Sequence, residues 1–353
     1  MNLIHGGDVY SARQKAGREP LDFSANINPL GMPPPAIEAA WQSLQQCIHY
    51  PDPLCRELRE ALAVYEGVPM KRIVCGNGAA DLIFRLITAV RPQKALLLAP
   101  TFAEYEQALR SVGCEIEFFT LREEELFSLT EAFLQMLSPE VDFIFLCNPN
   151  NPTGRTITPD LLQRIVKRCI ASQIVLVVDE CFNDFLEQPE HHTLKYALET
   201  APNLVLLKAF TKSYAMPGLR LGYCLCGSES LAERLLLCGQ PWSVSIPAQA
   251  AGIAALKERG YLEKTRLFVQ RERRWLTGEL QKLGMYVFPS EANYLLFRTQ
   301  TVIPLREQLE AQGVLIRSCS NYRGLDRRYY RIAVRRHDEN QKLVAALKNR
   351  LEG

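Results

Sequence analysis

Between about residue 58 and residue 252, short apolar runs alternate with segments that repeat with the period of an α-helix. The runs are hydrophobic throughout rather than at every second position, which is typical of strands covered on both faces of a sheet. Such alternation indicates an α/β fold whose sheet is mainly parallel and whose crossovers are right-handed. We expect strands at 94–99, 141–147, 174–178, 204–207 and 221–225. Helices are expected at 79–90, 103–112, 159–171 and 230–238.

The pattern changes after about residue 260. A long charged helix is expected at 262–283, strands at 294–297, 314–317 and 331–334, and a last amphipathic helix at 340–351. Strands followed by helices suggest a smaller α+β domain. We therefore expect an N-terminal arm (1–40) that packs with the small domain, a large domain (41–258) and a small C-terminal domain (259–353).

Composition limits the possible partners and the compartment. The chain has 353 residues, 47% hydrophobic and 23% charged, with a formal net charge of +2, so nucleic acid and anionic membrane surfaces are not expected partners. No apolar run has the length of a signal peptide or a membrane span. Eleven cysteines without a C-x-x-C pair predict buried free thiols, no metal site and a reducing compartment, most simply the cytoplasm.

Lys212 stands in the sequence FTKSYAMPGLRLG (residues 210–222), directly after an apolar run. A partly desolvated lysine can form an imine with an aldehyde, and the planar guanidinium of Arg220, eight residues later, suits a phosphate. The spacing alone would also fit a surface loop with two ordinary cations. The Pro-Gly-Leu-Arg-Leu-Gly ending makes the motif much more specific.

Asp179 ends the apolar run VLVVDE (residues 175–180), where a carboxylate is costly without a cationic partner. A protonated pyridine nitrogen would be such a partner. A helix cap or a metal ligand would explain the same residue.

Two further polar segments follow apolar runs. Residues 148–154 (NPNNPTG) form either a turn-rich loop or a site where an asparagine amide meets a flat ligand. Residues 76–81 (GNGAAD) open a helix whose free N–H groups can bind a phosphate, and they match the dinucleotide fingerprint only in part. In an open α/β sheet, segments beyond the carboxyl ends of the strands lie where ligands bind.

Taken together, these segments resemble the fold-type I pyridoxal-phosphate (PLP) enzymes, specifically the class I/II aminotransferase family, over nearly the whole chain. The resemblance implies a large domain with a mainly parallel sheet flanked by helices, plus a smaller α+β domain. It implies a homodimer with the active site at the subunit interface. Lys212 would carry the cofactor covalently, Asp179 would pair with the ring nitrogen, Asn151 would contact the ring hydroxyl and Phe102 would stack on the ring. The cofactor phosphate would be bound by Gly78, Ala79, Ala80, Thr211, Arg220 and, from the partner subunit, Tyr50.

Within this family, HGGD (5–8), LDFSANINPLG (21–31), QPWSVS (240–245), LIRSCSNY (315–322) and YYRIAVR (329–335) resemble the decarboxylase branch. That resemblance implies a small phosphorylated amino acid as substrate. The implied reaction is decarboxylation of L-threonine O-3-phosphate for cobalamin biosynthesis, with L-serine O-phosphate as a second substrate. The alternative is transamination of histidinol phosphate. The implied substrate-binding residues are His5, Asn26, Asn151, Arg317 and Arg331.

Phe182 separates the alternatives, because the aminotransferase branch usually has a tyrosine at this position. Ala209 departs from the family pattern, which often has a hydroxyl residue there, and this puts one contact to the cofactor phosphate in doubt. Without this resemblance, His5 would be a solvated residue of a loose arm, and Arg317 a cation at a strand edge.

The C-terminal region contains many arginines without interleaved aromatic residues, so a doubly anionic small molecule explains them better than nucleic acid. The remaining alternatives are a non-catalytic PLP-binding regulator and a nicotinamide-dependent dehydrogenase.

Overall fold

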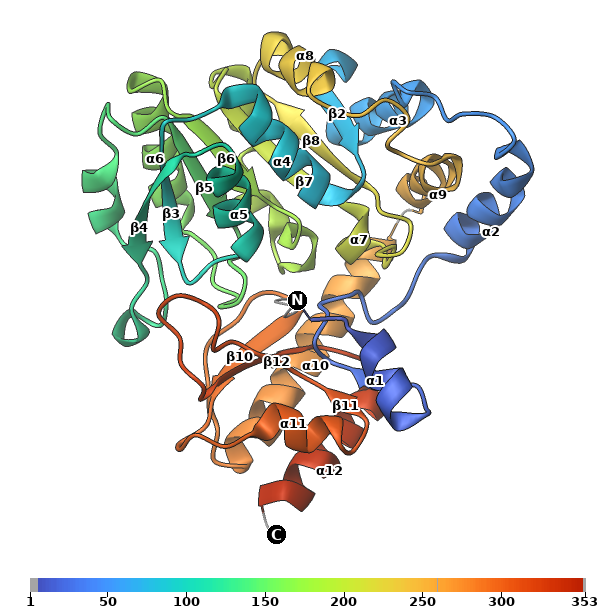
Figure 1. The fold of residues 1–353 in the computed structure, drawn as a ribbon, viewed down its shortest axis with the longest axis vertical. Coiled ribbons are helices and arrows are strands. Elements are labelled where there is room, and N and C mark those ends of the chain that lie inside the picture. The colour runs from blue at the N-terminus through green and yellow to red at the C-terminus, as the bar shows by residue number, and fades with distance from the viewer. Residues whose placement is uncertain (1–5, 259, 352–353) are drawn as a thin grey trace.

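The computed structural model describes residues 6–258 and 260–351, and Figure 1 shows a large sheet with helices on both faces above a smaller antiparallel sheet. Within these residues the large sheet has seven strands in the order β2-β8-β7-β6-β5-β3-β4. Their bounds are β2 Ile73–Gly76, β3 Lys94–Ala99, β4 Glu115–Thr120, β5 Phe143–Cys147, β6 Val175–Asp179, β7 Leu204–Ala209 and β8 Gly222–Cys226.

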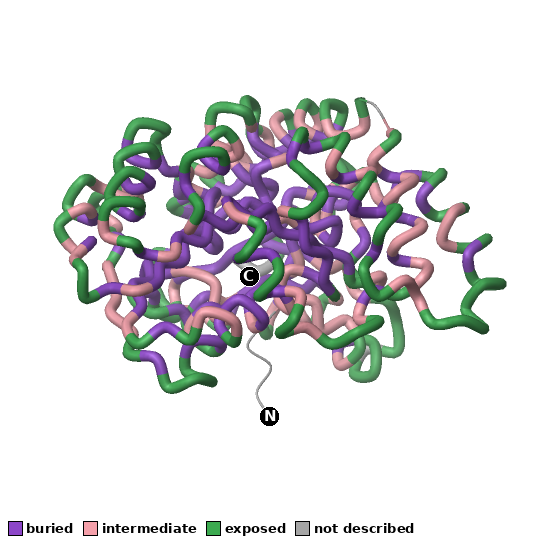
Figure 2. Tube along the Cα trace, turned by 90° about the horizontal axis from the view of Figure 1, so that it is seen from above, coloured by how far each residue is buried: buried purple, intermediate pink, exposed green. Residues whose placement is uncertain are grey.

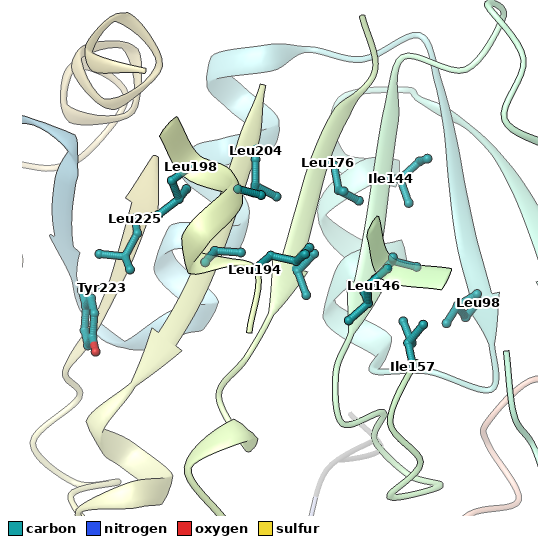
Figure 3. Close-up of a cluster of buried hydrophobic side chains, with 14 of the residues drawn as sticks. Leu98, Ile144, Leu146, Ile157, Leu176, Leu194, Leu198, Leu204, Tyr223 and Leu225 are labelled. Atoms are coloured by element: carbon teal, nitrogen blue, oxygen red, sulfur yellow. The ribbon is translucent and has the colours of Figure 1, made fainter. Parts of the chain in front are cut away.

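Both faces of the large sheet are covered, as the apolar runs predict. On β3, for example, Leu96 and Leu98 join one apolar cluster, whereas Ala95 and Leu97 join the other. Figure 3 shows the first cluster, in which Leu98, Ile144, Leu176 and neighbouring side chains project from successive strands toward the same layer. Seen from above, the buried residues concentrate in the centre of the molecule and the exposed ones lie at its rim (Figure 2).

Two groups of helices cover these faces. One face packs against α3 (Arg56–Glu66), α6 (Pro159–Ala171) and α9 (Ile246–Leu256). The opposite face packs against α4 (Gly78–Val90), α5 (Ala103–Ser111) and α8 (Glu229–Leu237). Short 3-10 helices connect the main elements: η1 Leu44–Gln46, η2 Met70–Arg72, η3 Glu123–Glu125, η4 Glu131–Met136, η5 Asn183–Phe185, η6 Pro189–His191 and η7 Lys195–Glu199.

The strand β8 runs antiparallel to both of its neighbours, β2 and β7, whereas the other pairs in this sheet are parallel. A parallel return needs a crossover of a dozen or more residues, usually with a helix. The connection 210–221 is twelve residues long but holds only the one-turn helix α7 (Phe210–Ser213), so it contains no crossover helix and the chain turns straight back. The strand β4 lies at the sheet edge and is half-exposed, so its sequence EIEFFT has no continuous apolar run.

The smaller sheet has the order β12-β13-β10-β9 and is antiparallel throughout. The expected strand at 314–317 divides at Ile316: its first half pairs with the arm, and its second half pairs with β13. The elements of this region are β9 Tyr286–Val287, β10 Tyr294–Arg298, β11 Val314–Leu315, β12 Arg317–Ser318, β13 Tyr329–Ala333, α10 Tyr261–Lys282, α11 Leu305–Glu310 and α12 His337–Leu351.

The N-terminal region contacts both parts of the molecule. After α1 (Val9–Ala16), β1 (Leu21–Asp22) pairs in parallel with β11, and these two strands form a separate sheet beside the small antiparallel one. The next helix, α2 (Pro34–Ser43), packs against α9 of the large domain and crosses residue 40. The division at residues 40 and 258 stays a prediction. No helix among the described residues is long and apolar enough to cross a membrane.

Candidate active site

A cavity of about 270 Å³ lies where the carboxyl ends of the large-sheet strands face the small sheet and the arm. In Figure 1, α7 lies on the side of the large sheet that faces β10, β12 and α10. Of the residues that the sequence singles out, these line the cavity: Asn26 from the arm; Ala79, Ala80, Phe102, Asn151, Asp179, Thr211, Lys212 and Arg220 from the large domain; Arg317 and Arg331 from the small sheet.

Lys212 lies in α7, immediately after β7, and its backbone carbonyl accepts a hydrogen bond from the N–H of Asn28 (3.2 Å). The Asn28 side chain donates to the carbonyl of Ser213 (2.7 Å) and to Oγ1 of Thr265 (2.9 Å), so the arm ties the lysine turn to α10. Burial, followed by the positive charges of Arg331 and Arg220, lowers the pKa of Lys212 to about 8. A lysine of this kind supplies a free amine near neutral pH, as imine formation requires.

Asp179 is the last residue of β6 and is buried, with 6% of its surface exposed. Its Oδ1 accepts a hydrogen bond from the N–H of Cys181 (2.9 Å), and its Oδ2 accepts one from the hydroxyl of Tyr105 (2.6 Å). A buried carboxylate with two donors is stabilised as the anion. It is therefore suited to hold a cationic nitrogen of a ligand in the cavity.

The three asparagines of residues 148–154 have different roles. Asn148 accepts from the N–H of Ile157 (2.9 Å), and the Asn150 side chain donates to the carbonyl of Pro100 (3.0 Å), so these two hold the loop together. Only Asn151 of the three lines the cavity. Its Oδ1 accepts a hydrogen bond from Nη1 of Arg331.

Arg331 on β13 joins three parts of the chain. Besides Asn151, its guanidinium donates from Nη2 to the carbonyl of Ser24 in the arm (2.8 Å) and lies over the ring of Tyr294 (5.6 Å to the centroid). Only 6% of Arg331 is exposed, and its Nε has no hydrogen-bond partner among the described atoms. A guanidinium fixed in this way is pre-organised for a carboxylate or a phosphate.

The first turn of α4 faces Arg220 and leaves no room for extra side-chain atoms. A Cβ on Gly78 (φ +80°) would lie 2.5 Å from Nη2 of Arg220, and a Cβ on Gly222 would lie 2.6 Å from the backbone nitrogen of Ala79. Arg220 itself has a positive φ of 59°, which is strained for a residue other than glycine. The N–H groups at a helix start and the nearby guanidinium form a site for a phosphate.

Three more residues that the sequence singles out line the cavity, whereas Tyr50 does not. Phe102 lines the cavity and contacts Tyr105 edge-on, with ring centroids 5.5 Å apart. Phe182 and Ala209 also line the cavity, so the wall has a phenyl ring and a methyl group where the family resemblance leads one to look for hydroxyls. Tyr50 does not line this cavity: it is 78% exposed and packs on Trp242 (4.7 Å between centroids).

The expected substrate-binding residues also gather here. Asn26 is buried and its Oδ1 has no partner among the described atoms. Arg317 donates to Oδ1 of Asn321 (2.8 Å) and lies over the ring of Tyr322 (5.5 Å). His5 lies outside the described residues, and Gly6, which follows it, lines the cavity.

The sequence motifs did not identify several residues of the cavity, among them Ser24, Glu104, Cys147, Cys181 and Tyr322. Tyr105 was also missed, although it lies three residues after Phe102 and so on the same side of α5. That spacing was the available signal.

One alternative cavity is less suited to this chemistry. A wider depression of about 890 Å³ lies between α3, α9 and α10, and none of the predicted site residues lines it. Among residues 6–258 and 260–351, no group of three or more His, Cys, Asp or Glu side chains is arranged to hold a metal ion.

The fold and the cavity define an α/β enzyme with an imine-forming lysine opposite a buried aspartate. The sequence model of the family described as "Aminotransferase class I and II" matches residues 18–347, and the chain belongs to this family. The cofactor of the family is PLP.

Individual relatives and solved structures are similar to this chain over nearly its whole length. The threonine-phosphate decarboxylase of Salmonella typhimurium is 42% identical over 100% of this chain and 98% of its own length. The solved structure of L-threonine-O-3-phosphate decarboxylase from Porphyromonas gingivalis has a TM-score of 0.81 and 28% identity, covering 94% of this chain and 99% of that one. The histidinol-phosphate aminotransferase of Clostridium acetobutylicum has a TM-score of 0.87 and 29% identity, with 94% and 98% coverage.

The residues of the cavity fit PLP on their own geometry. The two glycines keep the start of α4 clear beside Arg220, where a phosphate would lie. The anionic Asp179, at the end of β6, suits the ring nitrogen, and Lys212 suits the aldehyde. Phe102, Asn151 and Thr211 line the same cavity.

Proposed function

We propose that this chain decarboxylates L-threonine O-3-phosphate, giving CO2 and (R)-1-amino-2-propanol O-2-phosphate for cobalamin biosynthesis. The observation that carries the proposal is the arginine pair of the small sheet. Arg317 and Arg331 are register partners on β12 and β13, both are buried, and both line the cavity with Lys212. Like charges directly opposite each other on a sheet are unfavourable unless an anion lies between or beside them. A substrate with both a carboxylate and a phosphate meets that requirement.

The relatives support the same reaction. A protein named threonine-phosphate decarboxylase is 42% identical over the whole chain, and a bifunctional protein named for adenosylcobalamin biosynthesis is 33% identical over 99% of it. The Phe182 ring cannot donate a hydrogen bond, which agrees with the decarboxylase branch.

PLP, when bound, supplies an acceptor for the electron pair that remains on Cα after a bond is broken, provided that its ring nitrogen stays protonated. Asp179 keeps that proton in place by its negative charge. Arg331 and Arg317 bind the two anionic groups and so fix the rotation about the Cα–N bond, which decides which bond at Cα breaks. Lys212 would hold PLP through its amine, and when that amine is free it would be the group in the cavity that can take or return a proton at Cα. The Phe182 ring and the Tyr322 side chain line the same space.

Transamination of histidinol phosphate is the alternative, supported by the similarity to proteins of that name. Histidinol phosphate has a phosphate but no carboxylate, so in its own half of the reaction it would leave one of the two buried arginines without an anion.

The reaction is tested by incubating the purified PLP-loaded protein with L-threonine O-3-phosphate and no 2-oxo acid. We expect CO2 and the amino-alcohol phosphate in equal amounts. Absence of CO2, with turnover only when histidinol phosphate and 2-oxoglutarate are supplied together, would establish the alternative. L-Serine O-phosphate, which lacks one methyl group, is expected to react with a kcat/KM lower by about ten- to a hundredfold.

The chain is further proposed to act as a homodimer, with Tyr50 reaching the cofactor phosphate of the partner subunit. Exposed apolar side chains near Tyr50 in the sequence support this arrangement; they are Ile37, Trp41, Leu44 and Ile48, and Trp242 packs on Tyr50 itself. A second copy would bury these side chains, which otherwise form an unusually apolar surface for a monomer. Sedimentation equilibrium measures the assembly, and Tyr50→Phe in the dimer is expected to weaken PLP binding.

We propose the cytoplasm as the location, because all the cysteines of the chain are free thiols. His5, beside the cavity-lining Gly6, is proposed as a further ligand of the substrate phosphate.

A further inference from the structure

Asp179 receives one of its two hydrogen bonds from a residue that lies outside the cavity. Tyr105 is completely buried on α5, and its hydroxyl donates to Oδ2 of Asp179 over 2.6 Å. Cys181 supplies the other hydrogen bond through its backbone N–H, which no side-chain substitution removes, and its thiol also interacts with this carboxylate. The tyrosyl hydroxyl is thus a donor that a single side-chain substitution can remove while both contacts of Cys181 stay in place.

The Tyr105 ring is held on two sides. It stacks on Phe145 of β5 with the centroids 4.5 Å apart and the planes 13° apart, and it meets Phe102 edge-on. Rotation of the hydroxyl away from Asp179 would require repacking of these rings. Because Phe102 lines the cavity, Tyr105 contacts two residues of the cofactor site at once.

The hydroxyl remains a donor near neutral pH and well above it. Burial and the charge of Asp179 raise the pKa of Tyr105 well above its ordinary value. The same two causes raise the pKa of the Cys147 and Cys181 thiols, so these neighbours are neutral. Lys212 and Tyr294 are the other titratable groups that interact with Asp179, and burial keeps Tyr294 neutral by raising its pKa.

We propose that Tyr105 is a positioning residue for Asp179: its hydroxyl keeps the carboxylate ionised and correctly turned, and thereby sets how firmly the chain holds the protonated ring nitrogen of PLP. The inference depends on the cofactor of the family and not on which substrate is used. A buried carboxylate that loses one of two donors favours the neutral form more strongly. Without the Tyr105 hydroxyl, Asp179 should thus take up a proton at a higher pH and release the cofactor.

The test compares Tyr105→Phe with Tyr223→Phe. Tyr223 is also buried and donates to a buried carboxylate, Oε1 of Glu66, at 2.5 Å, but it does not line the cavity. The dissociation constant of PLP is measured for the apo forms by fluorescence titration between pH 5.5 and 8.5, without substrate. Each constant is divided by that of the unsubstituted protein at the same pH, which cancels the titration of PLP itself and of Lys212.

For Tyr105→Phe we expect a ratio of about ten to a hundred, the effect of one hydrogen bond to a charged group. This ratio should increase as the pH falls. For Tyr223→Phe the ratio should stay near one at every pH. A Tyr105→Phe ratio that does not change with pH, or that equals the ratio of the control, would overturn the proposal, because a purely structural defect acts equally at every pH.

Two further variants cover the case in which Tyr105→Phe does not fold. Site-specific 3-fluorotyrosine at position 105 preserves the ring and makes the hydroxyl a stronger hydrogen-bond donor. The loss of PLP affinity on acidification should therefore move to lower pH. A shift to higher pH would refute the role. In an Asp179→Asn background, 3-fluorotyrosine at this position should change the PLP affinity less than twofold. A larger change there would show that Tyr105 acts independently of Asp179.

Discussion

Arg317 and Arg331 lie directly opposite each other on the antiparallel strands β12 and β13, and both side chains line the cavity of Lys212. Each guanidinium is held by neighbours: Arg317 by Asn321 and the Tyr322 ring, Arg331 by Asn151 and Ser24. Without a bound anion, the repulsion between the two guanidinium groups destabilises the folded protein. It gives the site a strong preference for a doubly charged ligand.

Replacing Arg317 with Gln should therefore act mainly on substrate binding. We expect KM for L-threonine O-3-phosphate to rise about ten- to a hundredfold, the effect of a lost hydrogen bond between charged groups. Steady-state kinetics with CO2 detection measures this, and Arg328→Ala serves as the control, because Arg328 is paired with Asp326 on the surface (2.6 Å) and does not line the cavity. An unchanged KM in Arg317→Gln would place the substrate elsewhere.

The lowered pKa of Lys212 predicts the pH dependence of cofactor loading. Only the neutral amine attacks an aldehyde, and this form predominates above the pKa of about 8. The rate at which the apoprotein takes up PLP should rise about tenfold per pH unit below pH 8 and level off above it. Stopped-flow absorbance measures the rate. A rate that still rises steeply at pH 10 would show that Lys212 has the pKa of an ordinary lysine.

The same shift makes Lys212 a cost to the stability of the apoprotein. Between pH 8 and 10.5 the unfolded chain binds a proton that the folded chain does not, so the free energy of unfolding rises with pH in this range. Below pH 8 the penalty is constant. The apo form of Lys212→Met should therefore be more stable than the unsubstituted apoprotein at pH 7, by at most about 3 kcal/mol. Urea unfolding at pH 7 and pH 10.5 tests this, since the difference should disappear at the higher pH.

The close contact at Gly222 predicts a specific loss of phosphate binding. A Cβ at this position would lie 2.6 Å from the backbone nitrogen of Ala79, so Gly222→Ala must displace the first turn of α4. Because that turn faces Arg220, we expect PLP affinity to fall by about tenfold or more. Gly218→Ala is the matched control, because nothing lies within 4 Å of a Cβ there. Equal PLP affinity in the two variants would contradict this account of the phosphate site.

Most of the large sheet was predictable, because strands buried on both faces are continuously apolar and are recognisable without knowledge of their neighbours. The strand β4 was not, since at the sheet edge its side chains are half-exposed and its sequence is mixed. The direction of β8 depends on a short connection rather than on its own residues. The division of 314–317 at Ile316 depends on which partner strand each half meets, the arm or β13.

For the site, the sequence by itself predicted residues at or next to strand ends: Lys212, Asp179, Asn151 and the glycine that begins α4. Each follows an apolar strand with a residue type whose chemistry is local, so a linear motif identifies it. Only the tertiary structure decided which side chains are hydrogen-bonded to each other, because these pairs join distant parts of the chain. Tyr105 and Asp179 are 74 residues apart, and Asn151 and Arg331 are 180 residues apart. Such contacts are set by strand register and helix packing, which depend on the whole buried core rather than on any short segment.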